Sequence, residues 1–205
     1  MDDFRVSAPT DTCTKTYADY KRYKIPWLKQ DYFERCGYCN DHDAWSNGRR
    51  GMQIDHFVPK TKFSALFDVH HYSNLVYSCF YCNNNKSDDW ATADPFQAIG
   101  PDGKKGYIHP RNPDYDLAFK RSLDGSIVPQ NDIGQYMYTV LCLGLKRHRL
   151  IFHLEKLLMI YNELKTEIAD LSTSTADRKL LKEKLQEIAV EFVNYYQDFR
   201  ITLNN

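Results

Sequence analysis

Four of the six cysteines stand in two C-x-x-C pairs. Cys36 and Cys39 belong to the segment CGYC, and Cys79 and Cys82 belong to CFYC. A single pair of this kind would suit a redox-active dithiol at the start of a helix. Two pairs in one short region instead match the four thiolates of a tetrahedral zinc site, to which each pair contributes two ligands. We therefore predict a structural Zn²⁺ at these four cysteines, with no coordination position left open for a substrate.

The segment between the two cysteine pairs is rich in polar side chains that could do chemistry. GMQIDHFVPK, residues 51–60, places Asp55 next to His56. In a strand, adjacent side chains point to opposite faces, so these two cannot form a simple hydrogen-bonded pair. Asn74 precedes the second cysteine pair, and CNNNKSD adds Asn83 and Lys86 after it. We expect Asp55 and His56 to work with different partners from this region.

These elements resemble the HNH endonuclease family, in the cysteine-bearing branch of the ββα-metal nucleases. The resemblance is carried by CGYC, IDHFVPK and NLVYSCFYCNNNK, in that order, and it covers residues 36 to about 88. It implies a hairpin whose first strand ends at the Asp-His pair, with a helix packed across it from near the last cysteine. A divalent metal ion would lie between the hairpin and this helix.

The resemblance also implies a role for each polar residue. His56 is the expected general base, which suits an imidazole because its ordinary pKa of ~6.5 leaves it neutral at cellular pH. Asp55 and Asn83 are the expected ligands of the catalytic ion, and Asn74 would pin the hairpin loop or orient the base. The family often has histidine at the position of Asn83. An amide oxygen there favours Mg²⁺ (or Mn²⁺) over softer metals.

Lysines and the remaining histidines have weaker connections to this site. Lys60 and Lys86 could bind phosphates as point charges, although Lys60 fits an ordinary surface lysine equally well. The histidines outside the motif are expected to be structural or exposed: His42, His70, His71, His109, His148 and His153. Among them, His70 and His71 are the first to test. Cys13 and Cys142 are expected to be ordinary apolar residues.

Charge does not favour the binding of a polyanion by the whole surface. The 205 residues include 27 Lys plus Arg and 27 Asp plus Glu, so any contact with nucleic acid must come from local patches. The two candidate patches are Lys15, Lys21, Arg22, Lys24 and Lys29 interleaved with Tyr17, Tyr20, Tyr23 and Trp27, and the run Lys146, Arg147, His148 and Arg149. Each patch also fits a solvated helix face.

The pattern of apolar residues and turn residues predicts an α+β fold that is mainly α. The expected segments are an N-terminal helical arm (residues 1–35), the HNH nuclease core (36–92), a turn-rich connector (93–132) and a C-terminal helical region (133–205). In the arm, two short helices are expected to be broken at Pro26. In the connector, Asp124 and Gly125 predict the turn of a hairpin.

Two amphipathic stretches in the last third predict an antiparallel helical hairpin. Their apolar residues recur at spacings of three and four: Leu150, Leu154, Leu157, Tyr161, Leu164, Ile168 and Leu171, then Leu181, Leu185, Ile188, Phe192, Tyr195 and Phe199. Between them STSTAD, residues 172–177, predicts a turn and a helix start with Ser174 as the cap and Asp177 three residues on. Simple packing of the two helices is the favoured interpretation, but their length leaves room for a docking surface.

The resemblance implies a metal-dependent endonuclease that hydrolyses phosphodiester bonds, with DNA as the favoured substrate and with 5′-phosphate and 3′-hydroxyl products. The segment from Gly125 to Leu150 is also similar to small bacterial nucleases of anti-phage systems, of the Septu and retron-linked kinds, which act beside an ATPase. We therefore expect a defence nuclease with an ATPase or other protein partner at its C-terminal helices. The alternatives are a zinc-stabilised module that binds nucleic acid or protein without catalysis, and a subunit that is inert until a partner aligns its substrate.

The N-terminal sequence MDDFRVSAPTDTC contains no apolar run of the kind found in secretion signals. No stretch of the chain approaches the ~18 consecutive apolar residues needed to span a bilayer. We expect a cytoplasmic protein without membrane contact, in which reduced cysteines are available as metal ligands.

Overall fold

A computed structural model describes residues 1–46, 51–170 and 174–202. The chain divides into two compact units, Met1–Leu145 and Lys146–Asn205, and each is described by itself. The fold is α+β and mainly helical, as predicted. In the described residues, no helix combines the length and the apolar character needed to cross a membrane.

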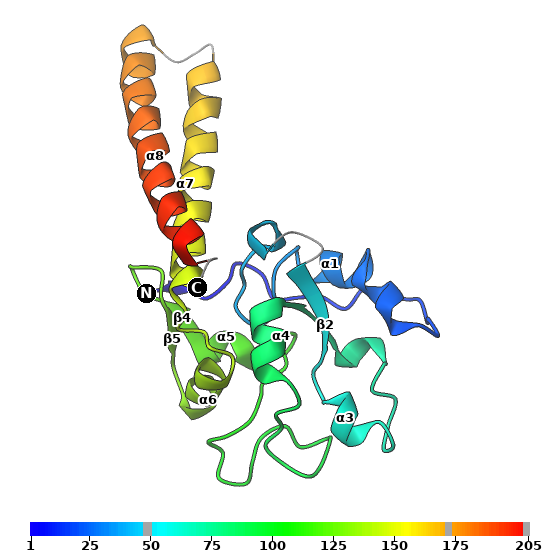
Figure 1. Ribbon diagram of the computed structural model, residues 1–205. Coiled ribbons are helices and arrows are strands. Elements are labelled where there is room, and N and C mark those ends of the chain that lie inside the picture. Colours follow the sequence, from blue (N-terminus) through cyan, green and yellow to red (C-terminus); the bar gives the residue numbers. More distant parts are fainter. Residues whose placement is uncertain (47–50, 171–173, 203–205) are drawn as a thin grey trace. The chain divides into compact units, whose positions relative to one another are not determined.

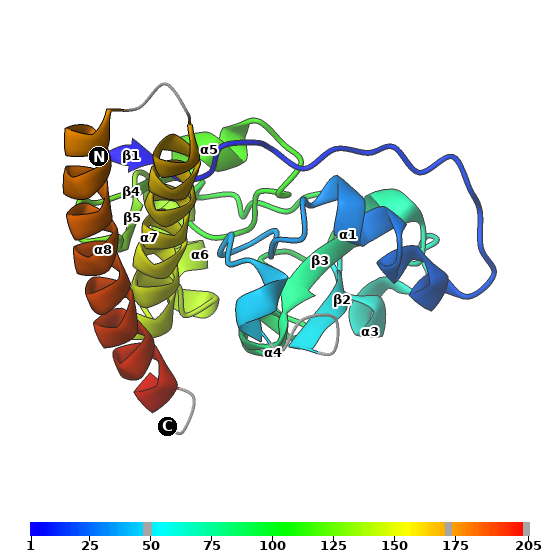
Figure 2. The ribbon, with the colours of Figure 1, turned by 90° about the horizontal axis from the view of Figure 1, so that it is seen from above.

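A β-hairpin and one short helix form the centre of the first unit. Strand β2 (Met52–His56) pairs antiparallel with β3 (Leu75–Cys79), and helix α4 (Phe80–Lys86) follows β3 directly. Helix α4 packs on both strands (Figures 1 and 2). The register places His56 opposite Leu75. The hairpin with a helix across it, expected from the resemblance, is therefore present.

Two short helices precede the hairpin and pack on it. The 3₁₀-helix η1 (Tyr20–Lys24) lies against β2, and helix α1 (Trp27–Asp31) lies against β3. The Ile25–Pro26 peptide bond between them is cis. Proline has no N–H and cannot continue a helix. The break expected at Pro26 is confirmed, because η1 ends at Lys24 and α1 begins at Trp27. The first of these helices brings Tyr20 to the side of β2.

Two strands of the connector and one from the N-terminal segment form a small three-stranded sheet. Its order is β1 (Asp2–Asp3), β4 (Phe119–Arg121) and β5 (Ile127–Pro129). The expected turn is present, and Gly125 in it has a positive φ of 79°. The strand before the turn, β4, has three residues, and helix α5 (Asp114–Ala118) precedes it directly. Pro113 and the acidic first turn of α5 favour this helix start.

The remaining helices of the first unit are short: η2 (Asp43–Ser46), α3 (Lys60–Phe63), η3 (Tyr72–Asn74) and α6 (Asp132–Val140). Several of the chain's 15 tyrosines are buried in the core around them. Their hydroxyl groups find polar partners inside: Tyr77 donates to Asp43 at 2.9 Å, and Tyr115 donates to the carbonyl of Tyr38 at 2.7 Å. A buried tyrosine needs such a partner, because an unpaired hydroxyl would be costly.

The second unit is the expected helical hairpin. Helices α7 (Lys146–Ala169) and α8 (Thr175–Thr202) pack side by side along their length (Figures 1 and 2). The predicted cap at Ser174 is confirmed: its Oγ accepts a hydrogen bond from the amide of Asp177 at 3.2 Å and donates one to the Asp177 carboxylate at 2.6 Å. The rest of the predicted turn, with Leu171, lies outside the described residues.

Candidate metal centre and active site

The four predicted zinc ligands come together in the first unit. Cys36 and Cys39 lie on the loop before β2, Cys79 ends β3, and Cys82 lies in the first turn of α4. All four are buried, and their sulfur atoms lie within 4.8 Å of one another. The Sγ atoms of Cys39 and Cys79 are 3.8 Å apart. Four sulfurs bonded tetrahedrally to zinc at about 2.3 Å stand about 3.8 Å apart, so the donor set fits this ion.

A glycine allows the first cysteine loop to approach the hairpin. The amide of Gly37 donates to the carbonyl of Tyr77 on β3 at 2.8 Å. A Cβ atom at this position would stand 2.6 Å from the ring of Tyr32 and 2.9 Å from the side chain of Val76. Only glycine therefore fits here without displacing the core, and its close contact ties the loop of Cys36 to β3, the strand that ends at Cys79.

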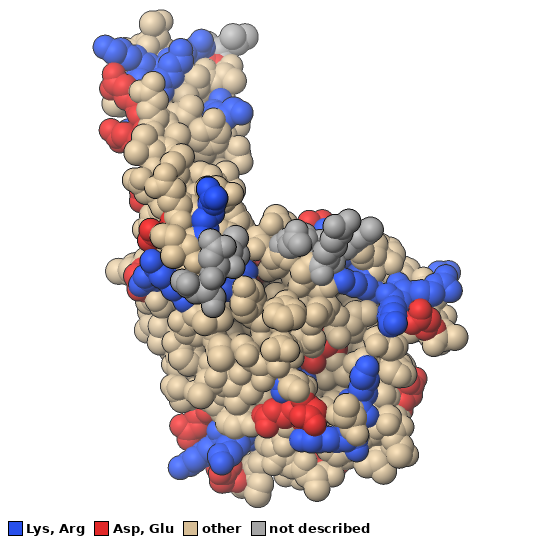
Figure 3. Space-filling model, viewed as in Figure 1, with Lys and Arg blue, Asp and Glu red and all other residues tan. Residues whose placement is uncertain are grey.

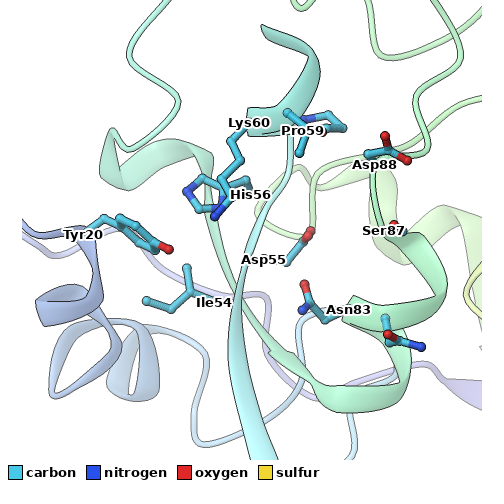
Figure 4. Close-up of a pocket in the computed structure, with 11 residues that line it drawn as sticks. Tyr20, Ile54, Asp55, His56, Pro59, Lys60, Asn83, Ser87 and Asp88 are labelled. Carbon is cyan, nitrogen blue, oxygen red and sulfur yellow. The ribbon is translucent and has the colours of Figure 1, made fainter. Parts of the chain in front are cut away.

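The Asp-His pair uses the two faces of β2, as expected from the alternation of side chains. Asp55 points towards α4, and His56 points towards Tyr20 on the other side (Figure 4). Both line a pocket of about 430 Å³ at the end of the strand. Asn83 and Lys60 also line this pocket. It therefore brings together four of the six residues predicted for catalysis and phosphate binding.

Asp55 is buried and held by two donors. The hydroxyl of Tyr38 lies 2.5 Å from its Oδ2, and the ammonium of Lys86 lies 3.1 Å from the same oxygen. Burial raises the pKa of Asp55 above its ordinary value, and the neighbouring charge of Lys86 and the hydrogen bond from Tyr38 oppose this rise. Burial also raises the pKa of Tyr38, so its hydroxyl stays protonated and donates. The carboxylate is thus fixed in place before any metal binds.

Lys86 differs from its expected role. Its side chain is completely buried, and its Nζ donates to the backbone carbonyl of His56 at 3.0 Å in addition to pairing with Asp55. Helix α4 turns this residue inward onto β2, where its charge is balanced by the carboxylate. Lys86 is not among the residues that line the pocket. The expectation that Lys86 contacts phosphate is therefore corrected: this lysine is an internal counter-ion of Asp55. Lys60, in contrast, is exposed at the pocket.

Asn74 ties the loop that follows β2. Its Oδ1 accepts from the amide of Val58 at 2.8 Å, and its Nδ2 donates to the carbonyls of Val69 at 2.8 Å and Val58 at 3.2 Å. Of the two roles that the resemblance implied, these contacts match the pinning of the loop. Asn74 is not among the residues that line the pocket.

Asn83 and Asp55 offer oxygen atoms to the same part of the pocket. The Nδ2 of Asn83 donates to the side chain of Gln53, which leaves its Oδ1 available. Figure 4 shows this oxygen turned towards Asp55. One carboxylate and one amide oxygen suit a hard divalent cation such as Mg²⁺, which keeps several of its own waters. The two predicted ligands therefore fit the ion that the resemblance implies.

His56 is neutral and has a ring partner in His70, one of the two histidines outside the motif that were marked for testing. Burial lowers the pKa of His56 to about 4, and the nearby side chains of His70, Lys60 and Lys86 add to this effect. Its Nε2 lies 2.9 Å from Nδ1 of His70. Tyr20 stacks on His70 and meets His56 edge-on. One sequence feature could have pointed to this pairing of His70 with His56. His70 lies in the loop that Asn74 ties to Val58, just after the end of β2.

The expected basic patch before the hairpin is partly used inside the molecule. Lys24 donates to the carbonyl of Met52, and Lys29 pairs with Asp43 at 2.8 Å. Lys21 and Arg22 on η1 remain exposed. Figure 3 shows basic side chains gathered at this end of the first unit, with acidic ones close to them. Local positive charge is therefore present near Tyr20, in a chain whose charges balance as a whole.

Comparison with known proteins agrees with the geometry. The model of the HNH endonuclease family matches residues 36–89. No curated protein and no solved structure matches the chain. The match spans the cysteine cluster, the β2–β3 hairpin and α4, and HNH nucleases use metal ions and act on nucleic acid. Residues 36–89 of this chain therefore form a domain of the HNH endonuclease family.

Proposed function

We propose that this chain is a metal-dependent endonuclease that hydrolyses phosphodiester bonds, with DNA as the favoured substrate. The observation that carries the proposal is the convergence of His56 with the oxygen atoms of Asp55 and Asn83 on one pocket. A neutral imidazole beside a pair of hard oxygen ligands is the arrangement that activates water against a phosphate.

In the proposed reaction, His56 takes a proton from a water molecule, and the oxygen of that water attacks phosphorus. The bond between phosphorus and the 3′ oxygen breaks, and the leaving oxygen is protonated from solvent, which gives 5′-phosphate and 3′-hydroxyl ends. Asp55 and Asn83 would hold Mg²⁺ or Mn²⁺, which when bound supplies positive charge for the phosphate and the leaving oxygen. Lys60, exposed at the pocket, would attract the phosphate backbone.

The cysteine cluster has a separate role in this proposal. Four thiolates complete the coordination of one Zn²⁺, so this ion would hold the fold and would not touch the substrate. It would join the loop before β2 to the junction of β3 and α4. These segments adjoin β2, which carries Asp55 and His56, and α4, which carries Asn83. Loss of zinc should therefore remove the geometry of the pocket as well as stability.

Cleavage of defined substrates by the zinc-loaded protein tests the proposal. Supercoiled plasmid, linear duplex, single-stranded DNA and RNA would be incubated with added Mg²⁺, with Mn²⁺ and with neither ion. We expect ion-dependent cleavage by the wild type and none by His56→Ala, with equal zinc content in both. Equal cleavage by the His56→Ala variant would refute the assignment of the base.

One observation supports the alternative of a binding module without catalysis. The Asp55 carboxylate already has an ammonium partner in Lys86, so a divalent ion would have to share it. If the wild type binds nucleic acid but cleaves none of the four substrates with either ion, this alternative replaces the nuclease proposal.

A defence role with a protein partner is a further part of the proposal. It is supported by the similarity of the segment after Gly125 to anti-phage nucleases, and by exposed apolar residues on the helical hairpin. These include Met159 on α7 and Val190 and Val193 on α8. Co-expression with an ATPase encoded beside the gene should give a stable complex in which α7 and α8 are protected from hydrogen exchange. An ATPase that does not co-purify with the chain would count against this part.

A further inference from the structure

We propose that His70 is a positioning residue that fixes the ring orientation and the tautomer of His56. This inference rests on the proposed nuclease function, because it concerns the group assigned as the base. His70 does not line the pocket that holds Asp55 and Asn83, and it acts on the reaction only through His56.

Three rings hold one another at the edge of the pocket. The Nε2 of His56 and the Nδ1 of His70 are 2.9 Å apart, and the planes of the two rings differ by 69°. The ring of Tyr20 is parallel to that of His70, with centroids 4.5 Å apart, and meets His56 edge-on at 4.8 Å. His56 is therefore restrained by a hydrogen bond in its plane and by an aromatic face at its side.

The loop that carries His70 is itself fixed. The backbone amide of His70 donates to the side chain of Asp68 at 3.0 Å. The preceding carbonyl, of Val69, accepts from the side chain of Asn74 at 2.8 Å. Both bonds hold the peptide group that precedes His70, so the backbone at His70 is fixed and its ring can act as a partner for His56.

The hydrogen bond between two imidazoles also decides which nitrogen can act as the base. A neutral imidazole carries one N–H, so one ring must donate and the other must accept. If His56 donates from Nε2, its Nδ1 has no proton and can take one from water. The reverse arrangement would place the proton of His56 on Nδ1 and remove the base. The Nδ1 of His56 has no hydrogen-bond partner among the described residues, which leaves it available to water.

The neighbouring histidine provides a matched comparison. His71 directs its Nδ1 to the hydroxyl of Ser73 at 2.8 Å and caps η3. It thus shares the loop and the exposure of His70, but its ring bonds to Ser73 and not to His56. Any effect that is specific to the His56 partner should appear on substitution of His70 and not of His71.

The test compares four full-length proteins: wild type, His70→Leu, His70→Asn and His71→Asn. An asparagine oxygen can replace Nδ1 as the acceptor, whereas leucine cannot. We expect His70→Leu to lower kcat about 10- to 100-fold with KM nearly unchanged, as for other partners that orient a functional histidine. We expect His70→Asn to recover most of the rate, and His71→Asn to match the wild type. Zinc content and circular dichroism check that each variant is folded.

Imidazole ¹⁵N spectra of the zinc-loaded protein provide a readout that does not depend on cleavage. The signals of His56, assigned by comparison with His56→Ala, should show the tautomer with the proton on Nε2. A proton on Nδ1 in the wild type would overturn the inference, whatever the activity. Full activity of His70→Leu, in a wild type that cleaves and a His56→Ala variant that does not, would overturn it while leaving the nuclease proposal intact. Absence of cleavage by the wild type would instead reject the nuclease proposal, and the spectra would still test the pairing of the two rings.

Discussion

Replacement of Lys86 by methionine should destabilise the first unit strongly. Lys86 is fully buried, and its ammonium lies 3.1 Å and 3.3 Å from the two oxygens of Asp55 and 3.0 Å from the carbonyl of His56. Removal of one member of such a pair leaves the other as an uncompensated buried charge, which costs about 3–5 kcal/mol. Methionine has a similar length and apolar stem, so the loss would come mainly from the charge and the hydrogen bonds.

Urea unfolding followed by tryptophan fluorescence suits this measurement. The three tryptophans, Trp27, Trp45 and Trp90, all lie in the first unit, so the signal reports on that unit and not on the helical hairpin. With an m-value of about 2 kcal/mol per M, a loss of about 3–5 kcal/mol lowers the urea midpoint by about 1.5–2.5 M. All samples would contain the same excess of Zn²⁺, so that the linkage of metal to stability is equal.

A double-mutant cycle separates the ion pair from the packing of the side chain. Asp55→Asn removes the buried negative charge, so the double variant with Lys86→Met should be more stable than the sum of the two single losses predicts, by about 1–3 kcal/mol. Lys60→Met is the matched control, because Lys60 is exposed, and it should change stability by less than about 0.5 kcal/mol. A loss below about 1 kcal/mol for Lys86→Met, or strict additivity in the cycle, would refute the reasoning.

Three further predictions concern the metal, the loop and the effect of pH. Cys82→Ser should prevent zinc binding and unfold the HNH domain, seen as loss of the tryptophan signal while the circular dichroism of α7 and α8 remains. Asn74→Ala should lower the free energy of unfolding by about 2–4 kcal/mol, because three hydrogen bonds to Val58 and Val69 are lost and buried backbone groups lose their partner. Burial lowers the pKa of His109 to about 3, below the ~6.5 of an unfolded chain, so below pH ~6.5 the unfolded state binds the extra proton. Stability should therefore fall on acidification from that pH, by up to about 1.4 kcal/mol per pH unit from this residue, and His109→Asn should remove that part of the slope.

Each of these predictions has an outcome that contradicts it. Retention of one equivalent of zinc by Cys82→Ser would mean that the cluster is not the metal site. A change below about 0.5 kcal/mol for Asn74→Ala would mean that water replaces its hydrogen bonds. Equal slopes of stability against pH for the wild type and His109→Asn would mean that His109 is not held neutral by burial.

The parts of the site that the sequence predicts are those set by local rules. Two C-x-x-C pairs give four thiolates, and the alternation of side chains along a strand places Asp55 and His56 on opposite faces. Both rules operate over a few residues and need no knowledge of the rest of the fold. The antiparallel helical hairpin is predictable for the same reason, because its apolar spacing extends over many turns.

The parts that the sequence does not predict depend on contacts between distant segments. Lys86 is expected from its motif to contact phosphate, and only the packing of α4 on β2 shows that it is buried against Asp55. Tyr38 lies between Cys36 and Cys39, and its hydrogen bond to Asp55 depends on how the cysteine loop folds back. The pairing of His70 with His56 requires the conformation of the whole loop after β2, which no local pattern encodes.

The position of Tyr20 has a practical consequence for work with shortened proteins. Its ring forms part of the pocket wall, yet it lies well upstream of the segment that the family shares. A fragment trimmed to residues 36–89 would keep the four clustered cysteines and His56 but would lose this wall, together with the buried side chains of Tyr23, Leu28 and Tyr32. Any shortened form of this chain that is meant to keep the pocket should therefore begin before η1.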